Sequence, residues 1–189
     1  MNKKHFGDSY DIVKKSLLCW LSQFGPWAAH PMFTDRWTKA KAGDFSNLIG
    51  VPLISRRLLT ADCNRDQYLA CCFDYKGSLF LDPDTGVRIE ESGRLARYLY
   101  ANELIKLTKS RPNSLTLTFD QALQRGREQD QIREKLKHFR SQGLHGFAYV
   151  SHASFVVLGC AADLVKQARE HVLRQSRLPR NRIITSRDS

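Results

Sequence analysis

The sequence contains no long apolar run. Hydrophobic residues make up 42% of the chain, but no stretch approaches the roughly 18 to 20 consecutive apolar residues that a membrane-spanning helix requires. The charged N-terminus is followed by neither the apolar region nor the small-residue cleavage site of a secretion signal. The sequence therefore predicts a cytoplasmic protein with no membrane partner.

The cysteines lack the spacing of a disulfide framework or a zinc site. There are five, an odd number, and no two of them form a CxxC pair. Free, reduced thiols are the simplest interpretation. Cys71 and Cys72 lie late in a predicted strand, residues 67–73, and have no evident histidine partner, so the sequence gives little support for a thiol nucleophile.

Several catalytic and nucleotide-binding motifs are also missing. The chain has no GxxxxGK[ST] loop, no GxGxxG that opens a helix, no GxSxG and no HExxH. These absences exclude the classical nucleotide and dinucleotide sites.

Positive charge is abundant. Lys and Arg total 30 against 19 Asp and Glu, which gives a formal net charge of +11. Such a charge attracts polyanions and supplies non-specific binding to phosphates. DNA or RNA is the predicted partner. The alternative is a merely basic surface, because the positive residues are spread along the chain.

Strands and helices alternate through most of the chain, whose 189 residues suit one domain. This order predicts an α/β fold with a Rossmann-like, mainly parallel sheet, helices on both faces and a terminal antiparallel hairpin. Residues 1–180 are expected to form this domain, and 181–189 a basic polar tail. The expected helices cover 9–24, 92–109, a segment ending near 142 and a last segment around 164–172; the expected strands cover 27–33, 51–54, 67–73, 78–81, 114–119, 147–150 and 155–160.

Carboxylates follow several predicted strands. Asp82 and Asp84 come directly after strand 78–81, while Asp35 and Asp120 follow two other strands. Ligands of open α/β sheets bind at the carboxyl ends of the strands, so these four side chains are expected to share a cleft. Asp35, Asp82 and Asp84 would bind Mg²⁺ or Mn²⁺, and Asp82, Asp84 and Asp120 would act in catalysis. The alternatives are a simple Asp-Pro-Asp-Thr-Gly turn, and helix N-caps at Asp35 and Asp120.

Other polar residues are candidates for two further roles. His152, in the hairpin connection, is a candidate general acid or base, or else a packing residue. Lys14, Lys15, Arg56 and Arg57 are candidates for holding nucleic-acid phosphates, although single basic residues are usually solvated surface.

Two segments resemble one family. GDSYDIVKK (Gly7 to Lys15) is similar to the basic N-terminal helix motif of Rossmann-like methyltransferases that act on adenine N6 in ribosomal RNA. LDPDTG (Leu81 to Gly86) stands where those enzymes have an Asp-Pro-Pro-aromatic tetrad, and the closing hairpin and last helix also fit. The resemblance implies methyl transfer from S-adenosylmethionine. The sequence departs from that family at Asp84 and Thr85, and residues 33–44 lack the glycine-rich turn of the cofactor site.

These observations leave three functional hypotheses. The added carboxylate Asp84, on a basic protein, favours a divalent-metal-dependent nuclease, because cations would neutralise the charge developing on a phosphodiester. The alternatives are an S-adenosylmethionine-dependent nucleic-acid methyltransferase and a non-catalytic nucleic-acid-binding or adaptor module.

Overall fold

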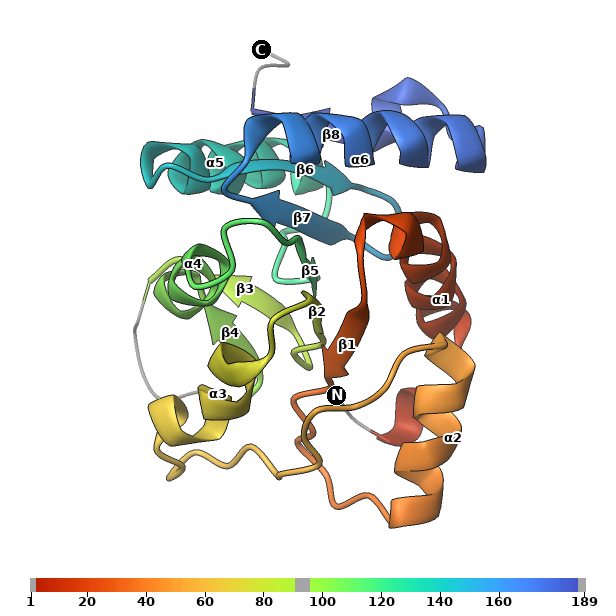
Figure 1. The fold of residues 1–189 in the computed structure, drawn as a ribbon, viewed down its shortest axis with the longest axis vertical. Coiled ribbons are helices and arrows are strands. Elements are labelled where there is room, and N and C mark those ends of the chain that lie inside the picture. The colour runs from red at the N-terminus through yellow and green to blue at the C-terminus, as the bar shows by residue number, and fades with distance from the viewer. Residues whose placement is uncertain (1–2, 91–95, 187–189) are drawn as a thin grey trace.

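The computed structural model describes residues 3–90 and 96–186 and has an α/β architecture built around a six-stranded sheet. The strand order is β1-β2-β5-β7-β6-β8 (Figure 1). A separate two-stranded sheet joins β3 (Gly86–Arg88) to β4 (Tyr98–Tyr100). The strands of the main sheet are β1 (Trp27–His30), β2 (Ser78–Leu81), β5 (Thr116–Phe119), β6 (His145–Tyr149), β7 (Phe155–Gly159) and β8 (Ile183–Thr185).

The strand directions confirm the predicted fold class. β1, β2 and β5 pair in parallel, whereas β7 runs antiparallel to both β5 and β6. Consequently β1, β2, β5 and β6 all point the same way, and only β7 and β8 point back. The predicted antiparallel hairpin is β6 with β7, which pairs Phe147 with Val157.

Helices cover both faces of the main sheet. Alternation along β2 places Phe80 in one apolar cluster and Leu79 and Leu81 in the other, because successive strand residues face opposite sides. The cluster with Phe80 is completed by α1 (Ser9–Leu21), α2 (Lys39–Ile49) and α6 (Ala162–Ser176). The opposite cluster is completed by α3 (Arg65–Asp74), α4 (Ala101–Lys109) and α5 (Glu128–Ser141). Short 3-10 helices lie at Lys3–His5, Ser22–Phe24 and Arg180–Arg182.

The segments between β1 and β2 differ from their predictions. Residues 51–54 form no strand, and only Leu53 makes an isolated bridge, to Ala29. The expected strand 67–73 is helix α3, which Asn64 caps by accepting from the Gln67 amide. Tyr68, Leu69 and Cys72 are its buried residues. Their spacing of i, i+1 and i+4 suits one helix face, but a short apolar run alone does not separate strand from helix.

Two other boundaries also need correction. The predicted helix 92–109 begins partly outside the described residues, and its described part consists of β4 followed by α4. The expected tail, 181–189, contributes β8 to the edge of the main sheet. Ile183 and Ile184 are 5% and 3% exposed, so burial of these two side chains holds the segment against β6.

Within residues 3–90 and 96–186, no helix combines the length and apolar character needed to cross a membrane.

Candidate functional site

A cavity of about 210 Å³ lies where the N-terminal part of α1 approaches the carboxyl ends of β2 and β5. Its walls combine aromatic rings with carboxylates. The lining residues are His5, Asp8, Tyr10, Lys14, Asp82, Pro83, Asp84, Phe119 and Gln121.

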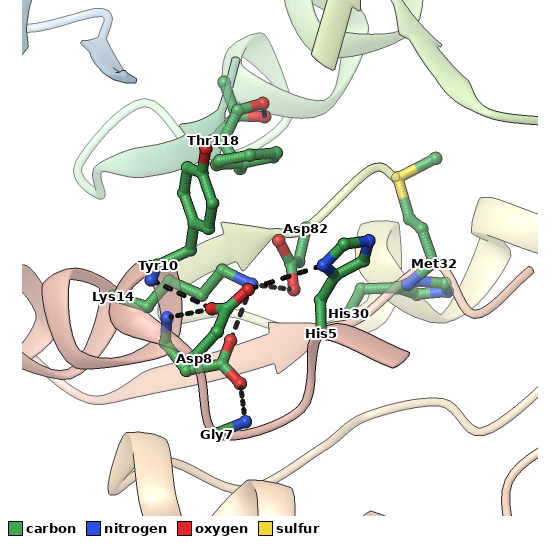
Figure 2. Close-up of polar contacts among 11 residues, drawn as sticks. His5, Gly7, Asp8, Tyr10, Lys14, His30, Met32, Asp82 and Thr118 are labelled. Carbon is green, nitrogen blue, oxygen red and sulfur yellow. Dashed lines mark hydrogen bonds and ion pairs between the residues drawn. The ribbon is translucent and has the colours of Figure 1, made fainter. Parts of the chain in front are cut away.

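The cavity is bordered by a buried ion-pair network. Lys14 Nζ donates to Asp82 Oδ2 and to Asp11 Oδ1, each at 2.9 Å. The Gly7 amide donates to the other oxygen of Asp11 at 2.8 Å. Figure 2 shows Lys14 reaching from α1 to Asp82, with His5, Asp8 and Tyr10 close by. The three ionic side chains are nearly inaccessible to solvent, so the network holds them in place.

Burial and neighbouring charges shift the pKa values of this network in opposite directions. Burial alone would lower the pKa of Lys14, but the carboxylates of Asp82 and Asp11 outweigh it and raise that pKa above 10.5. Burial raises the pKa of Asp82 above its ordinary value, although Lys14 opposes the change. The ammonium of Lys14 therefore offsets the negative charge of Asp82 and Asp11.

The turn after β2 brings Asp82 and Asp84 to the same cavity, as the sequence predicted for this pair. Asp84 also approaches the exposed Arg97, with 3.6 Å between Oδ2 and Nε. A divalent cation at Asp82 would have to compete with the ammonium of Lys14, which is already bound to that carboxylate. Three carboxylates thus line the cavity, those of Asp8, Asp82 and Asp84, and Asp82 is already paired with the ammonium of Lys14.

Asp120 faces a different set of partners. Its carboxylate accepts hydrogen bonds from Lys135 Nζ at 2.7 and 3.0 Å and from the amides of Val87 and Ala122. Gly86 lies so close that a Cβ there would overlap the Asp120 carboxylate. The contacts of Asp120 therefore tie the end of β5 to β3 and α5.

The expected cleft of four carboxylates is not formed. Neither Asp120 nor the half-buried Asp35 is among the residues that line the cavity of Asp82 and Asp84. Asp35 follows β1 and precedes α2, whose capping side chain is Thr38 rather than Asp35. Parallel strand ends meet at one edge of a sheet, but individual side chains at that edge still point in different directions.

His152 lies beside the cavity without lining it. Its exposed ring lies 5.5 Å from the ring of Tyr10, and its carbonyl accepts a hydrogen bond from Gln121 Nε2. Tyr10 also packs edge-to-face on Phe119, with 5.8 Å between ring centroids. His152 therefore contacts two of the lining residues, Tyr10 and Gln121.

The four predicted phosphate-binding residues occupy three different environments. Lys14 is buried in the ion-pair network, whereas Lys15 is exposed on α1. Arg56 and Arg57 are exposed and line a second cavity, of about 540 Å³, between the segment after β1 and α3. Of the four, Lys15, Arg56 and Arg57 are exposed and Lys14 is buried.

The second cavity adjoins a cluster of metal-ligand types that the sequence did not predict. His30, Cys71 and Cys72 offer ligand atoms that lie within 4.8 Å of one another, a spacing compatible with a metal ion. The interpretation that Cys71 and Cys72 lack a histidine partner was wrong, because β1 brings His30 to α3 from 41 positions earlier in the chain. Local spacing carries no signal for a partner so distant in sequence.

The segment after β1 is packed with side chains. Met32 and Phe33 are 0% and 1% exposed, and Met32 has a positive φ of 45°. The Met32 amide donates to His30 Nδ1 at 3.3 Å. The absence of a glycine-rich turn in the sequence thus corresponds to a segment filled by core side chains.

Sequence reasoning missed Asp11, Tyr10 and Lys135 as parts of these arrangements. The signal for Asp11 was present, since Asp and Lys three positions apart on a helix lie on the same face. A local signal existed for Lys135 too, because it lies three positions after Ile132 and four before Phe139, on the apolar face of α5.

Comparisons of the chain with protein-family models, with curated proteins and with solved structures return no match.

Proposed function

We propose that the protein binds nucleic acid and receives an unstacked base in the cavity beside Lys14 and Asp82. The observation that carries this proposal is the make-up of that cavity: aromatic walls from Tyr10 and Phe119, with hydrogen-bonding side chains at Asp84 and Gln121. Proteins that extrude a base hold it by stacking on aromatic rings and by hydrogen bonds to its edge.

Charge supports a nucleic-acid ligand. The formal net charge of +11 favours phosphate backbones. Lys15, on the same helix as Tyr10, is exposed and suits contact with a phosphate next to the bound base. The free cysteines agree with the reducing cytoplasm as the compartment.

Binding of matched oligonucleotides tests the proposal. Replacing Tyr10 by Ala removes one stacking surface, which costs about 1 to 3 kcal/mol per base and weakens binding by about fivefold to 150-fold. An oligonucleotide with an abasic position has nothing to insert there, so it should bind the wild type and Tyr10→Ala equally. Tyr75→Ala is the matched control, because Tyr75 is also half-buried but lies outside the cavity lining. A loss that is equal for both oligonucleotides would contradict base insertion.

Methyl transfer to the bound base is the second candidate. One contact favours it: the two segments that resemble the adenine-N6 methyltransferases meet in the bond between Lys14 and Asp82. Lys14 belongs to the GDSYDIVKK segment, and Asp82 to LDPDTG. A carboxylate held at the base-binding cavity would orient the amine that receives the methyl group.

One pair of assays separates methyl transfer from metal-dependent cleavage. Methyl incorporation from S-adenosylmethionine and Mg²⁺-dependent or Mn²⁺-dependent cleavage are measured side by side on the wild type, Asp82→Asn and Asp84→Asn. Methyl transfer predicts incorporation that Asp84→Asn largely retains. Cleavage that needs the metal and disappears in both variants would instead support a nuclease. If neither methyl transfer nor cleavage is detected and the protein still binds the oligonucleotide, only the base-binding role remains supported.

A further inference from the structure

The cluster formed by His30, Cys71 and Cys72 lies on the α3 side of the main sheet. His30 ends β1 and is 1% exposed, and its ring packs edge-to-face on Tyr68 with 4.9 Å between centroids. Cys72 is fully buried, and Cys71 is half-buried. None of the three lines the cavity of Asp82, although the His30 carbonyl accepts a hydrogen bond from the Asp82 amide at 3.1 Å.

One ring nitrogen of His30 makes no hydrogen bond. This atom, Nε2, is buried. A buried polar atom without a partner costs about 1 to 3 kcal/mol, so such atoms are rare in folded proteins unless a ligand satisfies them. Two sulfur atoms lie within 4.8 Å of this imidazole.

The two cysteines are unsuited to a disulfide with each other. Adjacent Cα atoms stand about 3.8 Å apart across a trans peptide, whereas disulfides usually join Cα atoms about 4.4 to 6.8 Å apart. Both thiols therefore stay available as ligands.

We propose that His30, Cys71 and Cys72 bind a zinc ion. Thiolate and imidazole are the ligand types that zinc prefers, and two sulfurs with one nitrogen is an established three-ligand set. A tetrahedral ion with Zn–S bonds of about 2.3 Å separates two sulfurs by about 3.8 Å, so small rotations of the side chains are sufficient. Water or a further ligand then occupies the fourth coordination position of the zinc ion.

Access to this position exists on the side of Cys71. Cys71 lines the cavity of about 540 Å³ together with Ser55, Arg56 and Arg57. A metal site needs an entry path as well as ligands, and this cavity supplies one.

One hydrogen bond must change when the ion binds. The Met32 amide donates to His30 Nδ1, which places the proton of the neutral imidazole on Nε2. Zinc at Nε2 requires that proton on Nδ1, so Nδ1 can no longer accept and the 3.3 Å hydrogen bond from the Met32 amide is lost. The amide resonance of Met32 should therefore shift on metal binding.

Cobalt titration of the reduced, chelator-treated protein tests the site. Co²⁺ replaces zinc and reports sulfur ligands through a thiolate charge-transfer absorption. We expect this absorption to saturate at about one ion per chain and to disappear when zinc is added. A wild-type protein without the absorption would overturn the proposal, and this result needs no variant.

Variants identify the ligands. Cys71→Ser should weaken metal binding by more than the roughly 10- to 100-fold cost of losing an outer-shell partner. Cys63→Ser is the matched control, because Cys63 is also half-buried and packs against the same apolar cluster outside the group of three. If both variants bound the metal with equal affinity, other residues would be its ligands and the proposed site would be wrong. Oligonucleotide binding by the same samples reports separately on the base site.

Discussion

Lys14 and Asp82, 68 positions apart in the chain, meet at 2.9 Å in a part of the protein that solvent hardly reaches. This bond joins the first helix to the end of β2 and fixes one wall of the cavity. A second carboxylate, Asp11, binds the same ammonium.

Replacing Lys14 by Met should therefore destabilise the protein strongly. The change removes the ammonium that the buried carboxylates of Asp11 and Asp82 both bind, and breaking a buried ion pair costs about 3 to 5 kcal/mol. Lys15→Met is the matched control, since Lys15 is exposed on the next position of α1. Urea unfolding at neutral pH should show a large decrease in the free energy of unfolding for Lys14→Met and not for Lys15→Met. Similar midpoints for the two variants would show that the network adds little to stability.

The pH dependence of that loss follows from the shifted pKa values. The pKa of Lys14 is raised on folding. The stabilisation that Lys14 adds to the folded protein is therefore complete below about pH 10.5 and is lost as the pH rises through the folded pKa. Burial raises the pKa of Asp82, so at acid pH this carboxyl protonates in the variant and its buried negative charge is removed. The difference between wild type and Lys14→Met should thus be largest near neutrality and shrink toward both extremes. A constant difference from pH 4 to 11 would contradict this.

A second buried cation gives an independent prediction. Lys135 binds Asp120 and also donates to the carbonyl of Val87. Lys135→Met should cost about 3 to 5 kcal/mol by the same reasoning, whereas Lys137→Met, on the exposed side of α5, should stay within about 0.5 kcal/mol of the wild type. Chemical unfolding of both variants measures this.

The main features of the fold could be predicted from the sequence because they depend on periodicity. Runs such as Ser78 to Leu81 bury every residue between two helical layers, and an apolar run bounded by Gly77 and a turn carries that information. Segment 67–73 was mistaken for a strand because its apolar residues are contiguous. The cap at Asn64 is the local signal that indicated a helix.

The candidate site could be predicted only in part. Asp82 and Asp84 were found because they follow a clear strand. Lys14 was noted as a basic residue, but its burial against Asp82 depends on how α1 packs on the sheet, which no local pattern encodes. The same holds for His30 and Cys71, which only the path of the chain from β1 to α3 brings together.

Nucleic-acid binding should depend steeply on salt. Each neutralised phosphate contributes about 0.9 to the slope of log affinity against log salt on duplex DNA, and about 0.7 on single strands. Lys15→Glu should lower the affinity and reduce that slope by about 1 or more. A fluorescence anisotropy titration between low and moderate salt measures both. Affinity that does not change with salt would contradict a phosphate-binding surface.

Photocrosslinking tests base insertion most directly. An oligonucleotide with a single halogenated pyrimidine is irradiated with the wild-type protein, and the linked peptide is identified by mass spectrometry. The base-binding account predicts a crosslink to Tyr10 or Phe119, lost when unmodified oligonucleotide competes and reduced in Tyr10→Ala. Crosslinks found only at residues outside the cavity, on a protein that binds the oligonucleotide fully, would contradict it.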